Sequence, residues 1–260
     1  MNQTFSTPPV EPAYPPPPRR VIFRPYVTFT LIGICVVAYL LQMLSGLIFN
    51  GNDLLFYYGG KINEFILAGQ LWRLFTPMFL HGSIIHIAFN MYALFNFGPG
   101  LELHYGRWRF LGLFILSGFA GNVMSFMFSV NPSLGSSTAI FGLLGAEGVF
   151  LYQNRQLFGE VARRALTQVV MIAGVNLVIG MSPGIDNWGH IGGLIGGSLF
   201  AWFAGPLLRR EGLFPPYKLV DNREKGGALW AHYPIPDGAI AGQLRDWGFK
   251  FSEGKGWWFK

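Results

Sequence analysis

The sequence predicts an all-α polytopic membrane protein, a bundle of six transmembrane helices followed by a small α+β appendage. Of its 260 residues, 51% are hydrophobic, 17% are aromatic and only 12% are charged, which is too apolar for an ordinary soluble domain. The apolar residues gather in charge-poor runs, each near the roughly 20 residues that a helix needs to cross a bilayer. The six runs are residues 25–49, 71–97, 110–129, 136–152, 165–181 and 188–208.

Basic residues are distributed unevenly between these runs. Arginines lie before the first run, between the second and third, between the fourth and fifth, and after the sixth, whereas the intervening segments carry only Lys61 and Arg73. The positive-inside rule therefore predicts that both ends of the chain are cytoplasmic. Because this bias explains most of the net charge of +6, we expect the lipid bilayer, and no nucleic acid, as a partner. The expected location is the bacterial plasma membrane.

The segments outside the runs suggest three domains. Residues 1–20 are rich in proline and polar residues, which predicts a disordered tail. Residues 21–210 form the membrane domain, in which residues 51–70 are aromatic and amphipathic and are expected to enter the outer interface. Residues 211–260 contain no spanning run, and their pattern predicts a cytoplasmic βαββ domain with a strand over 227–233, a helix over 237–248 and a final hairpin.

Polar residues lie near the same end of three predicted helices. They are His86 and Asn90 in the second, Ser137 in the fourth and His190 in the sixth. These helices run from outside to inside, so all four residues fall in the outer half of the bilayer. Ionisable groups are costly in lipid, which indicates a functional site. Because a neutral imidazole can accept a serine proton near neutral pH, Ser137 and His190 are candidates for nucleophile and base.

The same segments carry two further features of a hydrolytic site. His86 and Asn90 are spaced i, i+4 on one helix face, so that with the N–H of Ser137 they are expected to stabilise an oxyanion. Small residues allow two helices to approach closely. Those on the fourth and sixth helices are Gly135, Gly142, Gly145, Gly189, Gly193 and Gly197.

Between about residues 70 and 205, these motifs resemble those of the rhomboid family of intramembrane serine proteases. Five motifs of the family occur here in order: a Trp-Arg pair, HxxxxHxxxN, ExxxG, GxS, and a histidine followed by spaced glycines. The matching residues are Trp72 and Arg73, then His81, His86 and Asn90, then Glu102 and Gly106, then Gly135, Ser136 and Ser137, and finally His190, Gly193 and Gly197.

The resemblance implies a Ser137–His190 dyad, an oxyanion hole of His86 and Asn90, and cleavage of transmembrane protein substrates near the outer face, without metal or cofactor. It also implies structural support from His81, Trp72, Arg73, Glu102, Phe141, Gly135, Gly145, Gly193 and Gly197. Two positions differ from the family's pattern. Thr138 follows the nucleophile where glycine is usual, and Gly189 precedes the histidine where alanine is frequent.

Two other classes of protein stay open. A catalytically silent rhomboid-like protein would bind transmembrane clients, and replacing Ser137 would then change nothing. A transporter would use the histidines and Glu147 as a polar path, but the six runs show no matching interrupted halves. Glu147 lies ten residues after Ser137, about 15 Å deeper along a helix, so a structural carboxyl group is favoured. The sequence predicts no particular oligomeric state.

Overall fold

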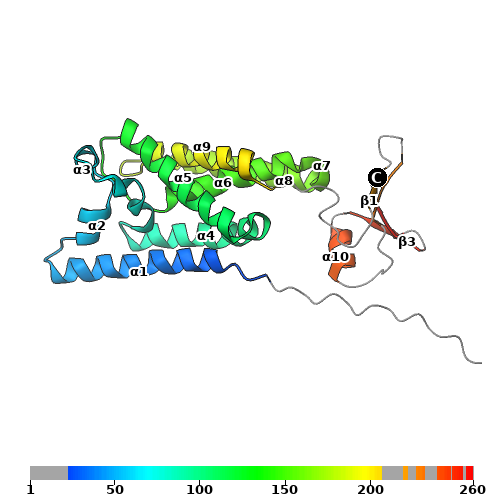
Figure 1. The fold of residues 1–260 in the computed structure, drawn as a ribbon, viewed down its shortest axis with the longest axis horizontal. Helices are drawn as coiled ribbons and strands as arrows, with labels where there is room; N and C mark the ends of the chain where they lie inside the picture. The colour runs from blue at the N-terminus through cyan, green and yellow to red at the C-terminus, as the bar shows by residue number, and fades with distance from the viewer. Residues whose placement is uncertain are drawn as a thin grey trace, which may run out of the picture.

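The computed structural model describes residues 23–206, 219–221, 227–231, 239–246, 248–253 and 256–259. The expected tail over residues 1–20 lies outside the described residues. Most of the described chain is helical, and a small sheet follows the helices (Figure 1). The helices are α1 (Tyr26–Ile48), α2 (Leu54–Gly59), α3 (Asn63–Leu67), α4 (Ile84–Tyr105), α5 (Arg107–Phe128), α6 (Ser137–Gln153), α7 (Arg155–Phe158), α8 (Glu160–Ile179) and α9 (Asn187–Ala204). Among the described helices, α1, α5 and α8 are long and apolar enough to cross a membrane.

The second apolar run folds differently from the expectation of one helix over residues 71–97. Two 3-10 turns, η1 (Leu71–Leu74) and η2 (Thr76–Phe79), come first, and α4 begins only at Ile84. Pro77 interrupts helical hydrogen bonding in the run. Ser83 then caps α4, its Oγ accepting a hydrogen bond from the N–H of His86 at 3.2 Å. His86 therefore lies in the first turn of α4 rather than several turns inside it.

Glu102 joins the C-terminal part of α4 to the start of α1, which runs beside α4 (Figure 1). Its fully buried carboxylate accepts hydrogen bonds from Val27 N at 3.0 Å, Thr28 N at 2.8 Å and Thr28 Oγ1 at 2.8 Å. These bonds satisfy N–H groups that the first turn of a helix leaves without partners. Gly98 lets the two helices touch, because a Cβ atom there would lie 2.5 Å from Thr28 Cγ2.

The core of the helical region lies between α5, α6 and α9, which pack on one another more extensively than the other helices. Buried apolar side chains such as Phe114 and Leu143 fill it. Glycine is required where α9 crosses α6, since a Cβ atom at Gly193 would overlap the carbonyl oxygen of Thr138, and one at Gly197 would overlap that of Gly142. The backbones of α6 and α9 are thus in direct contact.

Arg73 holds the segment between α1 and α4 in shape. Its guanidinium donates from Nη1 to Gly60 O at 2.8 Å, from Nη2 to Tyr57 O at 2.7 Å and from Nε to Gln70 Oε1 at 2.7 Å. The same group lies over the ring of Phe65, 4.6 Å from its centroid. One fully buried cation therefore joins α2 and α3 to η1.

Lys61 joins this segment to the chain between α5 and α6. Its backbone pairs with that of Ser133, and its ammonium group donates to Ser129 O at 2.7 Å and Asn131 O at 3.0 Å. Burial lowers the pKa of Lys61, and the charges of Asp186 and Glu64 oppose that effect. The loop is consequently fixed against the two helices that border the candidate site.

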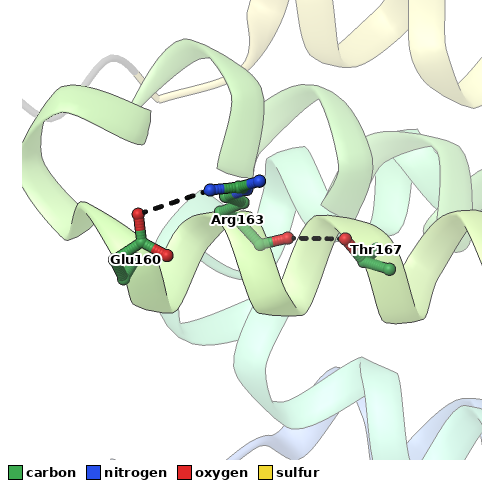
Figure 2. A network of polar contacts seen from close by, with 3 residues as sticks. All are labelled: Glu160, Arg163 and Thr167. Atoms are coloured by element: carbon green, nitrogen blue, oxygen red, sulfur yellow. Dashed lines mark hydrogen bonds and ion pairs between the residues drawn. The ribbon is translucent and has the colours of Figure 1, made fainter.

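Helix α8 packs more loosely, with Ala162 and Val169 as its buried residues. Figure 2 shows the polar contacts near its N-terminus, where Glu160 Oε1 lies 3.7 Å from Arg163 Nη1 and Thr167 Oγ1 donates to Arg163 O at 3.0 Å. The two charged side chains are 74% and 80% exposed. Such an exposed ion pair contributes little to stability.

The C-terminal part forms a four-stranded antiparallel sheet in the order β1-β2-β4-β3. Its elements are β1 (Leu219–Asp221), β2 (Leu229–Ala231), α10 (Ala239–Asp246), β3 (Lys250–Ser252) and β4 (Gly256–Phe259). Leu229, Ala231, Leu244 and Trp257 are buried as a small core. The structure thus has the predicted βαββ order with one further strand, β1, which pairs with β2.

Candidate active site

Ser137 is the first residue of α6, where a sharp turn presents it. Gly135 has a φ of +135°, a conformation that residues with a side chain rarely adopt, and its N–H donates to Pro77 O at 2.9 Å. Ser136, between Gly135 and Ser137, is fully buried, and its Oγ lies 3.1 Å from His81 Nε2. The turn is therefore fixed at Gly135 and at Ser136, and Ser137 begins the helix with its own N–H free of an intrahelical partner.

His190 meets Ser137 from the first turn of α9. Its Nε2 lies 2.9 Å from Ser137 Oγ, a distance suitable for transfer of the serine proton. The imidazole ring stacks on Phe141, with centroids 4.3 Å apart and planes 10° apart. Burial and stacking leave the ring little freedom to turn, so its Nε2 stays directed at the hydroxyl group.

His86 lies beside Gly135 of the turn that carries Ser137. A Cβ atom at Gly135 would come within 2.7 Å of His86 Nε2 and Cε1, so the ring occupies the space beside this glycine. The N–H of Gly82 donates to His86 Nδ1 at 3.5 Å, which assigns the ring proton to Nε2. His86 thus directs a donor toward the turn that carries Ser137.

Asn90 follows His86 by one helical turn and is 7% exposed. Among the described residues, its Nδ2 has no hydrogen-bond partner. Buried amide groups normally have partners, and one that lacks them requires an explanation. An unpaired amide on the same helix face as His86 is suited to bind a developing negative charge.

The other predicted support residues lie in the segment before α4, in α4 itself, and at the contact of α6 with α9. The His81 ring is 5.2 Å from that of His86, and Trp72 Nε1 donates to Tyr58 O at 3.1 Å. Gly145 lies where a Cβ atom would come 2.5 Å from Leu194 O and 2.6 Å from Ser198 Oγ of α9. Arg73, Glu102, Gly193 and Gly197 hold the loop and the helix contacts described above rather than touching Ser137.

Thr138 and Gly189, the two departures from the family's pattern, face one another. A Cβ atom at Gly189 would lie 3.0 Å from Thr138 Cγ2, closer than side chains normally pack. Thr138 is buried, and its Oγ1 has no partner among the described residues. The larger residue after Ser137 is thus accommodated by the smaller residue before His190.

Asp186 is a residue of this region that the sequence analysis did not identify. It caps α9, with Oδ1 accepting from Gly189 N at 3.1 Å and Oδ2 accepting from Ser125 Oγ of α5. The sequence held a signal, because aspartate directly before an apolar helical segment is a common N-cap. In the described part of the chain, no cluster of three or more His, Cys, Asp or Glu residues could hold a metal ion.

Comparison with known proteins places these residues in a family. Residues 68–207, more than half of the chain, match the Rhomboid domain. Rhomboid protease GluP of Bacillus subtilis (strain 168) is 40% identical over 192 residues, which are 74% of this chain and 37% of that protein. RHOMBOID-like protein 9, chloroplastic, of Arabidopsis thaliana is 39% identical over 153 residues, 58% of this chain and 35% of that protein. RHOMBOID-like protein 4 of the same plant is 33% identical over 183 residues, 70% and 44% respectively.

The chain spans less than half the length of these relatives. The matched region nevertheless contains the whole candidate site, from Trp72 to Gly197. With the membrane-length helices α1, α5 and α8, the match identifies a multi-pass membrane protein. The chain belongs to the rhomboid family.

Proposed function

We propose that this chain is an intramembrane serine endopeptidase that cleaves membrane-anchored protein substrates near the outer face of the bilayer. The observation that carries the proposal is the 2.9 Å separation of Ser137 Oγ and His190 Nε2, contributed by two separate helices. Similarity to a protein named as a rhomboid protease supports the same class of reaction.

In the proposed mechanism, Ser137 Oγ attacks the carbonyl carbon of the scissile peptide bond while its proton passes to His190 Nε2. The oxyanion that forms accepts hydrogen bonds from His86 Nε2, Asn90 Nδ2 and the N–H of Ser137. The imidazolium then protonates the leaving amine, and an acyl-enzyme remains. A water molecule, deprotonated by His190, hydrolyses this ester and regenerates Ser137.

We further propose six spans, α1, α4, α5, α6, α8 and α9, with both ends of the chain in the cytoplasm of a bacterial cell. Support comes from the arginine distribution and from the length and hydropathy of α1, α5 and α8. In this topology α4, α6 and α9 all begin at the outer side, and Ser137 and His190 lie just beneath it. In this arrangement the tail is residues 1–20, the membrane domain is residues 21–210 and the cytoplasmic domain is residues 211–260.

The proposal is tested with the full chain reconstituted in lipid vesicles and a single-span substrate bearing small residues near its outer boundary. We expect the wild type to cleave it, and Ser137→Ala and His190→Ala to lower kcat at least about a thousandfold, as loss of a nucleophile or base does in serine proteases. Ser117→Ala is the matched control. It also removes a buried serine hydroxyl, whose shortest hydrogen bond goes to Leu113 O of its own helix at 2.6 Å and whose bond to Ala139 O of α6 is longer, at 3.4 Å, so turnover should persist.

Two outcomes would contradict the proposal. If Ser137→Ala cleaves as fast as the wild type, the dyad assignment is wrong. If the wild type leaves a panel of such substrates intact but binds them as tightly as Ser137→Ala does, the chain is a catalytically silent protein that binds transmembrane clients.

A further inference from the structure

Asp186 occupies a position that the proposed mechanism does not use. Both of its carboxylate oxygens accept hydrogen bonds, Oδ1 from Gly189 N and Oδ2 from Ser125 Oγ. Its main-chain oxygen accepts from the N–H of His190 at 3.2 Å. A half-buried carboxylate is thus held one helical turn before the proposed base, by contacts that come from both α5 and α9.

The surroundings keep this carboxylate in place. Ser125 is fully buried, and its Oγ lies 3.4 Å from Ser133 Oγ. Ser133 is the residue whose backbone pairs with Lys61, and the charge of Lys61 interacts with that of Asp186. The Ser125 and Ser133 hydroxyl groups and the backbone pairing of Ser133 with Lys61 therefore lie between the carboxylate and the buried cation, and no direct ion pair joins the two charges in the described structure.

His190 is unfavourably placed to become positively charged. It lies in the first turn of α9, where the helix dipole is positive and disfavours a cation, and it is buried. Its Nδ1 has no partner among the described residues, so no carboxylate bonds to the ring itself. Yet the proposed base must carry a proton each time Ser137 reacts. Asp186 and His86 are the ionisable groups, among those described, whose charges act on His190.

We propose that Asp186 is a positioning residue for His190. Asp186 fixes the first turn of α9 and supplies the negative charge that stabilises the His190 imidazolium during acylation. This inference rests on the proposed function. The Asp186 side chain then has two separate roles. One is the N-cap hydrogen bond, which an amide can also make, and the other is the negative charge, which an amide cannot supply.

Asp186→Asn tests the charge, because asparagine is as good an N-cap as aspartate. We expect kcat in vesicles to fall about tenfold, equivalent to about 1.4 kcal/mol of barrier, with KM and the unfolding temperature nearly unchanged. Labelling of Ser137 by a fluorophosphonate should slow in parallel, since it needs the same proton transfer. Ser125→Ala, which removes one hydrogen bond and keeps the charge, should retain most of kcat.

Asp53→Asn is the matched control. Asp53 is also a half-buried N-cap, its Oδ1 accepting from Phe56 N of α2 at 3.0 Å, and it is not part of the dyad or its donors. Unchanged kcat and labelling in Asp186→Asn would overturn the inference, as would an equal loss in Ser125→Ala or Asp53→Asn. If wild type cleaves and Ser137→Ala does not, the proposed function stands in either case; if neither cleaves or labels, both proposals fall.

Discussion

The contact between Thr138 and Gly189 predicts that these positions are energetically coupled. In Gly189→Ala, the new Cβ atom would lie 3.0 Å from Thr138 Cγ2 and 3.1 Å from Asp186 Oδ2. Inserting a methyl group into a well-packed site costs about 1 to 3 kcal/mol, and the better helix propensity of alanine offsets at most about 1 kcal/mol. We expect a net loss of about 1 to 2 kcal/mol of stability, and lower kcat because His190 is the next residue.

A double-mutant cycle isolates the part that Thr138 contributes. Thr138→Ala removes Cγ2 and an Oγ1 that has no partner among the described residues, so by itself it should change stability by less than about 1 kcal/mol. In that background Gly189→Ala should cost about 1 kcal/mol less, a coupling typical of residues in contact. The overlap with Asp186 is present in both backgrounds and cancels.

The assay is denaturant unfolding in detergent of the four proteins of the cycle, with initial cleavage rates measured on the same samples. Gly174→Ala combined with Thr138→Ala is the control pair, because no atom lies within 4 Å of a Cβ atom at Gly174. Its effects should add within about 0.5 kcal/mol. If the Thr138/Gly189 pair is equally additive, the two positions do not share space and the explanation of these departures is wrong.

Three further changes test other contacts. Gly197→Ala forces α9 away from Gly142 O and should destabilise the protein by about 3 kcal/mol or more, with loss of cleavage; calorimetry that finds no loss of stability would contradict the packing. Gly174→Ala is the control, which should keep cleavage and raise stability by at most about 1 kcal/mol through the better helix propensity of alanine. Arg73→Lys cannot keep three directed hydrogen bonds and should cost about 2 kcal/mol, seen as faster proteolysis between α1 and α4. Glu102→Gln leaves buried N–H groups at the start of α1 poorly paired and should cost about 2 kcal/mol, with faster amide exchange at Val27 as the check.

Much of the candidate site could be predicted because its chemistry lies in local spacing. His86 and Asn90 share a face by their i, i+4 interval, and the positive-inside rule predicts that both lie in the outer half of the bilayer with Ser137 and His190. The structure brings Ser137 and His190 within hydrogen-bond distance, and it leaves Asn90 Nδ2 unpaired among the described residues. Those positions follow from periodicity and orientation, which the sequence contains.

The features that were not predicted depend on tertiary contacts. The late start of α4 reflects Pro77, whose carbonyl group accepts from Gly135, and hydropathy cannot distinguish an apolar 3-10 turn from an apolar helix. Strand β1 exists by pairing with β2. The hydrogen bond from Ser125 to Asp186 joins residues 61 positions apart, which no local pattern indicates. Sequence patterns report which face of an element is buried, but not which distant polar group will meet it.

The site lies where the N-termini of α4, α6 and α9 converge, and this arrangement has a physical consequence for the proposed reaction. Ser83 satisfies one N–H group of α4, but the first turn of α6 directs unpaired N–H groups and the positive end of its dipole at the reacting centre. That field favours an oxyanion on the substrate and opposes an imidazolium on His190, although both must form together. A carboxylate at the cap of α9, and not at the caps of α4 or α6, lowers the energy of the His190 imidazolium. It also leaves the N–H donors of α4 and α6 free for the oxyanion. The position of Asp186 at the α9 cap, rather than at α4 or α6, therefore fits the role that we propose for it.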